Sequence, residues 1–379
     1  MSAGPAGAAG EGAARRIVVA PDSFKGTVDA AGAAAAIARG WLAERPGDDL
    51  VLRPMADGGE GTIDAFAAAV PGAERVPVTV SGPVAGAPEV ATAWLRLPDG
   101  TGVVELAATS GLHLVDPLRP EDAHTVGFGQ AIVAALEAGV ERLLLGLGGS
   151  ASTDGGAGAL TAMAAQFVDE SGRPVDPGSR GLDQLARVDL TGLPPLPPRG
   201  ALILGDVTNP LLGPTGAAAV FGPQKGADAE TIPLLEHRLE RLVALVPDGA
   251  RLAAADGAGA AGGTGFGLLA WGAEMGAGSR LVADAIGLAD ATARADLVIT
   301  GEGRYDGQSE AGKAPTEVAR LAREAGVPVA LVAGAITAEP AGFEASVALT
   351  ALAGSSAAAM VDPVAWLEAA GRALARTQG

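Results

Sequence analysis

Residues 16–27 read RIVVAPDSFKGT, a short apolar run that ends in a loop containing an acid, a lysine and a glycine. A short apolar run bounded by turn residues is typical of a buried strand. The pattern continues with a helical segment, a second strand, an acidic glycine-rich loop and another helix, at about 29–44, 50–54, 55–61 and 62–69. Alternating strands and helices indicate a parallel α/β sheet.

The same rhythm returns near residue 295. We predict a buried strand, a glycine-rich turn, a helix, two strands and a closing helix at 295–300, 301–306, 316–325, 327–332, 347–352 and 363–376. We therefore expect residues 1–75 and 290–379 to form one discontinuous Rossmann-like domain, built on a doubly wound parallel sheet.

The region between these segments has a different texture. Residues 75–106 alternate and are rich in Val, Thr and Pro, which indicates antiparallel strands. A helix near 127–138 and strands at 142–146 and 201–204 follow. We expect residues 76–289 to form an inserted mixed α/β domain, with the active site in the cleft between the two domains.

Composition excludes several classes of protein. The chain of 379 residues has no cysteine and three histidines far apart in sequence, so thiolate chemistry is excluded and a histidine-rich metal site is disfavoured. Its net charge of −18 argues against nucleic-acid and anionic-membrane partners. Residues 1–14 are rich in Ala and Gly, so we expect a disordered tail and no signal peptide. We expect a cytoplasmic protein, monomeric or homodimeric.

Lysine is rare in this sequence. All three lysines, Lys25, Lys225 and Lys313, lie beside a glycine, whereas arginine occupies the other basic positions. A lysine is a compact point charge that suits phosphate oxygens in tight sites. We interpret these lysines as phosphate ligands; ordinary loop lysines are the alternative.

Five loops share one form, in which acids alternate with glycines or small polar residues. They are residues 21–27, 55–62, 148–158, 205–225 and 301–306. Glycine lets backbone N–H groups approach a phosphate, and carboxylates beside phosphate are suited to holding Mg²⁺ or accepting a proton. The combination indicates metal-assisted phosphoryl transfer, although any one of these loops could be only a turn.

Two further motifs are weaker. Residues 307–314 almost match a P-loop, but Ala314 replaces the hydroxyl residue that binds Mg²⁺ and no strand directly precedes the segment. Residues 262–267 are rich in glycine but lack the strand that a dinucleotide site requires. We interpret 262–267 as a close-packing turn before a helix at 268–275.

Five ordered segments resemble the signatures of the bacterial type-1 glycerate kinases. They are APDSFKG at 20–26, PMADGGEGT at 54–62, DVTNPL at 206–211, VFGPQKGA at 220–227 and ADLVITGEGR at 295–304. The resemblance implies a two-domain α/β fold and Mg²⁺-dependent transfer of phosphate from ATP to D-glycerate, with 2-phosphoglycerate as the favoured product. Two positions depart from the family pattern: Ser152-Thr153 replaces a threonine-asparagine pair, and Tyr305 replaces an aliphatic residue.

Phosphoryl transfer needs a neutralised triphosphate, a positioned hydroxyl and a proton acceptor. The hypothesis assigns phosphate binding to Lys25, Lys225 and the amides of Gly58, Gly59, Gly155 and Gly156, and Mg²⁺ binding to Asp57 and Glu60. It assigns proton acceptance to Asp206 and the glycerate carboxylate to Arg304 with Lys313. Asp22, Ser23, Asp154, Asn209, Glu302 and Asp306 complete the predicted site, and the catalytic residues are Asp206, Lys25 and Asp57.

Three alternatives remain open. The enzyme could phosphorylate another small hydroxy acid, such as tartronate or a longer aldonate. It could be a hydrolase with Ser23 or Ser150 as nucleophile, although no histidine partner is evident. It could also be a non-catalytic sensor of a nucleotide or organic acid.

Overall fold

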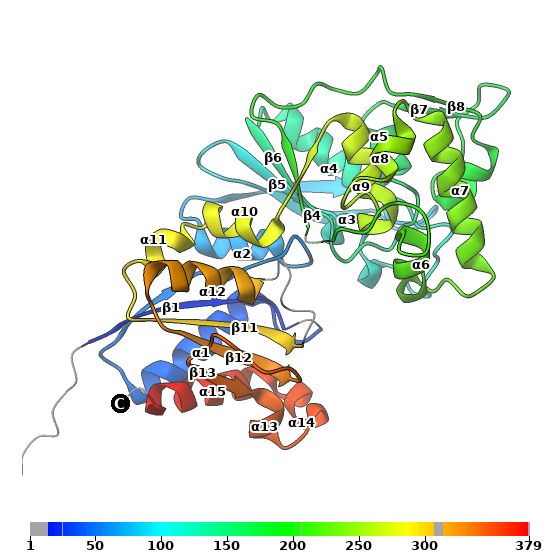
Figure 1. Cartoon of the computed structure of the whole chain (residues 1–379). Coiled ribbons are helices and arrows are strands. Elements are labelled where there is room, and N and C mark those ends of the chain that lie inside the picture. The colour runs from blue at the N-terminus through cyan, green and yellow to red at the C-terminus, as the bar shows by residue number, and fades with distance from the viewer. Residues whose placement is uncertain (1–13, 25, 206, 307–313, 378–379) are drawn as a thin grey trace, which may run out of the picture. The chain divides into compact units, whose positions relative to one another are not determined.

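The computed structural model describes residues 14–24, 26–205, 207–306 and 314–377. These residues form two compact units (Figure 1). Unit 1 draws on Met1–Pro54, Gly287–Ser309 and Val318–Gly379, and unit 2 draws on Met55–Ile286 and Glu310–Glu317. Among the described residues, no helix is long and apolar enough to cross a membrane.

Unit 1 contains a parallel five-stranded sheet in the order β13-β12-β11-β1-β2. Its strands are β1 (Arg16–Pro21), β2 (Asp49–Leu52), β11 (Leu297–Tyr305), β12 (Val329–Ile336) and β13 (Ala345–Ala348). Its helices are α1 (Ala30–Glu44), α11 (Leu288–Thr292), α13 (Leu349–Ala353), α14 (Ser356–Val361) and α15 (Pro363–Thr377), together with α12 (Ala314–Ala325) from Val318 onward. Helices α1 and α15 cover one face and α12 covers the other (Figure 1), so the predicted doubly wound parallel sheet is confirmed.

The core of unit 1 lies where α1 and α15 cross beneath β1. Ile17 and Val19 of β1 pack with Ile37 and Trp41 of α1, and all four side chains are fully buried. A methyl group at Gly40 of α1 would lie 1.9 Å from the backbone oxygen of Glu368 in α15. The two helix backbones therefore meet at a distance that only glycine permits.

We predict that Gly40→Ala lowers the free energy of unfolding by about 1–3 kcal/mol, because the added methyl group must push α15 away. This loss should exceed the gain of about 1 kcal/mol in helix propensity that the change brings. Urea unfolding measures the effect. The control is Gly47→Ala, where an added methyl group has nothing within 4 Å; an equal response at both positions would contradict the close-contact argument.

The structure corrects two boundaries of the C-terminal prediction. The predicted glycine-rich turn at 301–306 is wrong for most of its length, because β11 continues to Tyr305 and pairs Arg304 with Ala335 of β12. The predicted strand at 347–352 ends early, since β13 stops at Ala348 and α13 begins at Leu349. In both cases the strand ends where its pairing with a neighbouring strand ends. Strand β12 extends to Ile336 beside β11, whereas β13 pairs with β12 only as far as Ala348.

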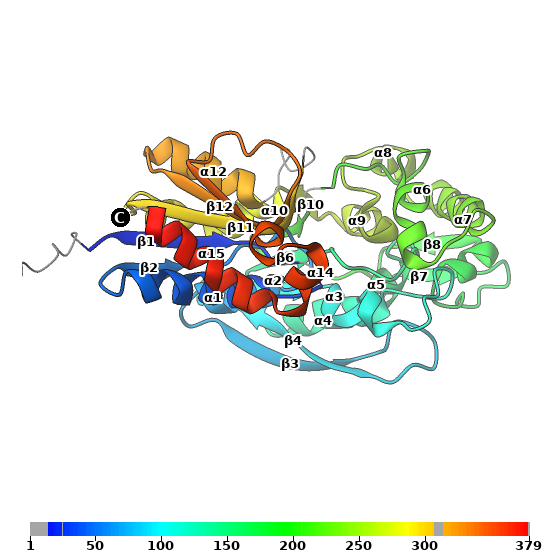
Figure 2. The ribbon, with the colours of Figure 1, turned by 90° about the horizontal axis from the view of Figure 1, so that it is seen from below.

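Unit 2 contains a six-stranded sheet in the order β10-β9-β6-β5-β4-β3. Strands β3 and β4 at one edge of this sheet are labelled in Figure 2. The strands of the sheet are β3 (Glu74–Val80), β4 (Val90–Arg96), β5 (Thr101–Glu105), β6 (Arg142–Gly146), β9 (Ala201–Leu204) and β10 (Glu274–Gly276). The antiparallel strands predicted from residues 75–106 are confirmed, because β3 pairs with β4 and β4 with β5 in that sense. The pairs β5–β6, β6–β9 and β9–β10 are parallel.

Helices pack on both faces of this sheet. Helix α4 (Val126–Glu137) joins the main apolar core, whereas α2 (Thr62–Ala69) and α10 (Gly278–Ala285) lie near Leu144 on the other face. The remaining elements are α3 (Ala107–Ser110), α5 (Ala157–Ala162), β7 (Gln166–Val168), β8 (Arg187–Asp189), α6 (Ala217–Phe221), α7 (Thr231–Leu245), α8 (Gly249–Ala253) and α9 (Ala260–Trp271), with 3₁₀ turns at Leu112–Leu114, Ser179–Gln184 and Pro223–Lys225.

Residues 55–75 group with unit 2, whereas the sequence-based division placed them in the first domain. Helix α2 packs on β4 and β5, and the backbone N–H groups of Gly61 and Ile63 donate to Glu105 at the end of β5. The contacts of this segment are therefore made with the six-stranded sheet. Helix periodicity alone does not reveal which sheet a helix will cover.

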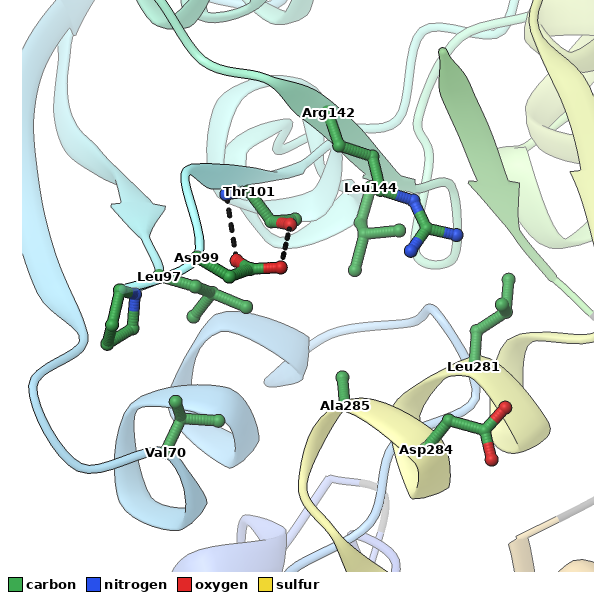
Figure 3. A pocket seen from close by; sticks show the side chains of 10 residues that line it. Val70, Leu97, Asp99, Thr101, Arg142, Leu144, Leu281, Asp284 and Ala285 are labelled. Carbon is green, nitrogen blue, oxygen red and sulfur yellow. Dashed lines mark hydrogen bonds between the residues drawn. The ribbon is translucent and has the colours of Figure 1, made fainter. Parts of the chain in front are cut away.

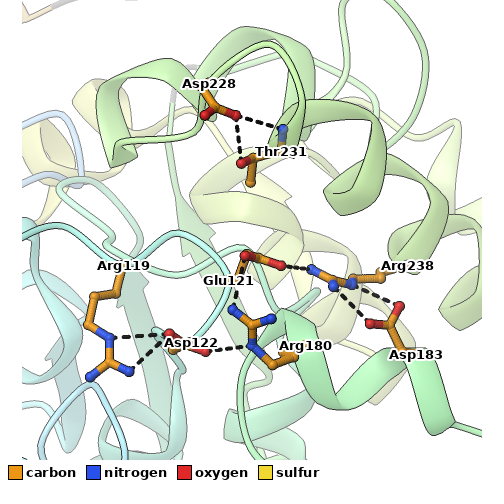
Figure 4. A network of polar contacts seen from close by, with 8 residues as sticks. All are labelled: Arg119, Glu121, Asp122, Arg180, Asp183, Asp228, Thr231 and Arg238. Atoms are coloured by element: carbon orange, nitrogen blue, oxygen red, sulfur yellow. Dashed lines mark hydrogen bonds and ion pairs between the residues drawn. The ribbon is translucent and has the colours of Figure 1, made fainter.

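An arginine network fixes α7 to the rest of unit 2 (Figure 4). Arg238, with a 5% exposed side chain, donates two hydrogen bonds to Asp183 and a third to Glu121. Arg180 donates to Glu121 and Asp122. A buried guanidinium is tolerated when its donors are satisfied in this way, and loss of one partner would leave a costly buried charge.

Candidate active site

The acidic glycine-rich loops of unit 2 gather at one edge of its sheet. Strands β5, β6 and β9 are parallel neighbours, so their carboxyl ends meet at that edge. The loop at 57–61 lies against it: Gly58 accepts a 3.0 Å hydrogen bond from the backbone N–H of Gly148. A methyl group at Gly58 would lie 2.2 Å from the Leu204 backbone oxygen, and φ there is +91°. Only glycine lets this loop approach both strand ends.

Glu105, the last residue of β5, holds the same loop from beneath. Its Oε1 accepts from Gly61 N–H and its Oε2 from Ile63 N–H, each at 3.0 Å. The residue is 5% exposed, and burial raises the pKa of Glu105 to about 7, although the two backbone donors act in the opposite direction. Sequence reasoning missed this residue. The signal that could have identified it is the position of this acid at the end of an apolar strand, in the stretch VVEL at 103–106.

Asp57 and Glu60 are the predicted Mg²⁺ ligands, and they differ in environment. Asp57 Oδ1 accepts a 3.0 Å hydrogen bond from Gly59 N–H, whereas Glu60 is exposed. Carboxylate oxygens suit Mg²⁺, which keeps several waters and takes one or two protein carboxylates. The described residues contain no group of three or more acidic or histidine side chains placed to hold a metal ion.

Asp154 organises the loop at 148–158 from inside. It is fully buried, and its carboxylate accepts hydrogen bonds from Thr125 N–H, Thr125 Oγ1, Gly156 N–H and Gly158 N–H at 2.8–3.2 Å. Four donors satisfy a buried carboxylate. The structure therefore shows Asp154 positioning the loop through contacts with the protein itself. Thr125, which the sequence analysis did not select, helps to hold this loop because it donates two of the four hydrogen bonds to Asp154.

Lys225 lies beside Asp154 in the same buried region. It is 2% exposed, and its ammonium donates to the backbone oxygen of Ser152 and, at 3.4 Å, to Ser150 Oγ. Burial lowers the pKa of Lys225 to about 7, and Asp154 opposes this shift. The contacts of Lys225 in this structure hold the loop. Ser150 is itself buried, which leaves it poorly placed as the nucleophile of the hydrolase alternative.

Gly155 and Gly156 are packed against the start of α9. Gly155 N–H donates to the Gly262 oxygen at 3.1 Å, so this amide is engaged within the protein, like that of Gly156. Residues 261–263 all have left-handed backbone angles, and a methyl group at Gly262 would lie 2.1 Å from the Ser152 oxygen. The close-packing turn predicted at 262–267 is therefore confined to residues 261–263. The regular helical part of α9 follows from Thr264 and ends at Trp271, earlier at both ends than the predicted helix at 268–275.

The third loop of unit 2 begins after β9. The side-chain amide of Asn209 donates to the backbone oxygen of Thr215 at 2.8 Å. The backbone oxygen of Asn209 accepts from Gly259 N–H at 3.0 Å. Asn209 thus closes its own loop and ties it to the segment before α9. The predicted proton acceptor Asp206 lies outside the described residues.

Unit 1 brings together a second set of predicted residues at the carboxyl ends of β1 and β11. Asp22 N–H donates to the Gly301 oxygen at 2.8 Å, which places Asp22 beside Glu302, and each of these two acids is 8% exposed. The Asp22 carboxylate accepts from Ser23 N–H at 2.6 Å. Arg304 is exposed, with its Nε 3.7 Å from Asp306 Oδ2. Lys25 and Lys313 lie outside the described residues.

The predicted residues thus form two groups, one in each unit. Unit 2 gathers Asp57, Gly58, Gly59, Glu60, Asp154, Gly155, Gly156, Asn209 and Lys225. Unit 1 gathers Asp22, Ser23, Glu302, Arg304 and Asp306. The residues of unit 1, with Asp154, Gly155, Gly156 and Asn209 of unit 2, follow the carboxyl ends of parallel strands or lie on the last residues of a strand. Residues 57–60 lie against the same ends in unit 2, and Lys225 follows α6. This arrangement defines an α/β enzyme that acts on small polar ligands.

Comparisons with known proteins place this enzyme in a family. The profile of the glycerate kinase family matches residues 17–378. A glycerate kinase of Bacillus subtilis (strain 168) is 43% identical over 85% of each chain, and a glycerate 2-kinase of Escherichia coli (strain K12) is 41% identical over 85% of this chain and 86% of its own. A crystal structure described as glycerate kinase 2 from Salmonella typhimurium LT2 covers 96% of this chain and 98% of its own at 38% identity, with a TM-score of 0.80.

The chain therefore belongs to the glycerate kinase family, as the sequence resemblance implied. It is an enzyme with kinase activity, and membership of a kinase family implies the use of ATP. Its substrates belong to the class of small molecules.

The raised pKa of Glu105 gives a prediction for stability. Between about pH 4.5 and 7 the folded chain binds a proton at Glu105 that the unfolded chain releases, so this residue's contribution to stability is complete below that range and is lost as pH rises through it. The unfolding free energy of wild type minus that of Glu105→Gln should fall by up to about 3 kcal/mol across the range. Urea unfolding at several pH values measures it. The control is the exposed Glu170→Gln, and a flat difference for Glu105 would contradict the assignment.

Proposed function

We propose that the protein transfers the γ-phosphoryl group of Mg·ATP to the 2-hydroxyl of D-glycerate, giving 2-phosphoglycerate and ADP. The observation that carries the proposal is the match of the family profile to residues 17–378, together with relatives named glycerate kinase and glycerate 2-kinase at more than 40% identity. The chemistry of both residue groups supports it, since each combines acids with glycines or cations at strand ends.

Phosphate binding in this proposal is assigned to Lys25 and to the loop at 57–61. This loop brings Gly58 against two strand ends and leads into α2. The amides at the start of α2, those of Gly61 and Ile63, already donate to Glu105, so the amide of Gly58 is the one assigned to phosphate. The amides of Gly155 and Gly156 already have hydrogen-bond partners in the protein, so we assign their loop a structural role and not phosphate binding. Lys225 contributes positive charge from its buried position in that loop.

We assign Mg²⁺ to Asp57 and Glu60, whose carboxylate oxygens are the ligand type that this ion prefers. When bound, the ion would neutralise charge on the transferring phosphoryl group. The residues of this chain would hold the loop that presents those oxygens: Glu105 fixes its end and Gly58 fixes its approach to β6 and β9.

The acceptor side of the reaction is assigned to Asp206 and Arg304. Asp206 follows β9 by two residues and would accept the proton of the attacking hydroxyl. Arg304 is an exposed guanidinium at the end of β11 and would pair with the glycerate carboxylate, with Lys313 supporting it. Asp22, Ser23, Glu302 and Asp306 would orient the hydroxyls of the substrate.

The reaction is tested by ADP release from Mg·ATP with D-glycerate, with L-glycerate, tartronate and no acceptor as controls. D-glycerate-dependent turnover supports the proposal, and phosphorus–proton coupling in the NMR spectrum of the product distinguishes the 2-phosphate from the 3-phosphate. Faster turnover with tartronate would move the assignment to another hydroxy acid. Folded protein without turnover on any acid would favour a sensor.

We also propose that the protein is cytoplasmic and that it is a monomer or a homodimer. Light scattering can test the oligomeric state.

We predict that Asp206→Asn lowers kcat by at least about 100-fold with little change in KM, because the amide keeps the shape but cannot accept the proton. Steady-state kinetics of the purified variant measures both constants. The matched control is Asp176→Asn, an exposed acid of unit 2 between β7 and the 3₁₀ turn at Ser179–Gln184. An unchanged kcat for Asp206→Asn would remove Asp206 from the proton-transfer role.

A further inference from the structure

A cavity of about 480 Å³ lies in unit 2 at the amino ends of its parallel strands (Figure 3). Thr101 and Arg142, the first residues of β5 and β6, line it. The active-site loop at 148–158 follows the last residue of β6, and the loop at 57–61 lies against the same end of β6. The cavity therefore lies at the opposite edge of the sheet. None of the residues that line it belongs to the predicted site.

The cavity wall is mixed, with apolar side chains covering only slightly more of it than polar ones. Side chains from the end of α2, the β4–β5 turn, β6 and α10 form its apolar part: Val70, Leu97, Pro98, Leu144, Leu281 and Ala285. Apolar side chains beside a few polar groups are typical of sites for small molecules. The apolar part of the wall favours an occupant with a short hydrocarbon part.

Arg142 is the cation of this cavity. Its side chain extends from the start of β6 toward α10 (Figure 3). Its Nε is buried and has no hydrogen-bond partner within the described part of the chain. Buried polar groups are almost always paired, so the unpaired Nε indicates a missing acceptor beside a residue that lines the cavity. The planar guanidinium matches a carboxylate with two parallel hydrogen bonds.

Two acids also line the cavity, and they differ in their pairing. Asp99 accepts hydrogen bonds from Thr101 N–H, Thr101 Oγ1 and Arg199 Nη2, each at 3.0 Å. Its charge is thereby largely offset. Asp284 lies on the exposed side of α10. Together these carboxylates disfavour a dianion such as hydrogen phosphate and permit a monoanion.

We propose that this cavity binds a small aliphatic monocarboxylate, with its carboxylate on Arg142 and its hydrocarbon part against the apolar part of the wall. The site is separate from the candidate active site, and the proposal stands whether or not the protein phosphorylates glycerate. Val70 directly follows α2 and Leu281 lies in α10. These are the helices whose other ends adjoin the loop at 57–61, because Gly278 packs against the Asp57 backbone oxygen.

Calorimetric titration of the full chain with butyrate tests the proposal. We expect saturable binding to one site in the wild type and a loss of affinity of at least tenfold in Arg142→Met. Arg142→Lys should retain more affinity than Arg142→Met, because it keeps the charge. Ala285→Leu fills the cavity without touching a charge, and we expect it also to weaken binding at least tenfold.

The matched control is Arg304→Met, which removes an exposed arginine of the candidate active site and should leave butyrate affinity unchanged. Circular dichroism verifies that each variant is folded. Absence of saturable binding to the wild type overturns the proposal. So does loss of binding in Arg304→Met with retention in both Arg142→Met and Ala285→Leu, since butyrate would then occupy the candidate active site. Displacement of butyrate by equimolar inorganic phosphate would overturn the monocarboxylate assignment.

Discussion

The pairing of β1 with β11 is the contact on which unit 1 depends. It joins Ile17 in parallel register to Leu297, a residue 280 positions later in the chain. Because β1 lies between β2 and β11, the sheet is incomplete until the end of the chain returns. Closing so long a loop has a large entropic cost, which the fully buried Ile17, Val19, Leu297 and Ile299 help to offset. The insertion of unit 2 follows directly from this pairing.

Parallel strands also explain where the chemistry gathers. Every strand of such a sheet ends at the same edge, so loops that are distant in sequence become neighbours there. In unit 2 this principle brings together the ends of β6 and β9, and the loop at 57–61 lies against both, at Gly148 and Leu204. In unit 1 it places Asp22 beside Gly301. Where two such loops approach each other closely, glycine is required, and carboxylates lie around these positions. This combination is why the loops could be recognised from their composition.

The interior of the site was less predictable. Asp154 and Lys225 were selected as ligands of substrate or phosphate, yet both are buried and make their described contacts within the protein. A charged residue in a glycine-rich loop has the same sequence signature whether it binds a ligand or supports the loop. Glu105 illustrates the opposite case, since an isolated acid at a strand end gives little signal, but the structure shows it binding two amides of the α2 N-terminus.

The sequence by itself determined the α/β class, the return of the first sheet near residue 295, the antiparallel strands at 75–106 and the family. These features depend on local periodicity and on ordered motifs, which are properties of neighbouring residues. Only the tertiary structure decided that residues 55–75 join unit 2, that β11 runs through Arg304, and that Arg142 lines a cavity. Each of these depends on which distant segment lies alongside, because pairing partners and burial are set by packing and not by local pattern.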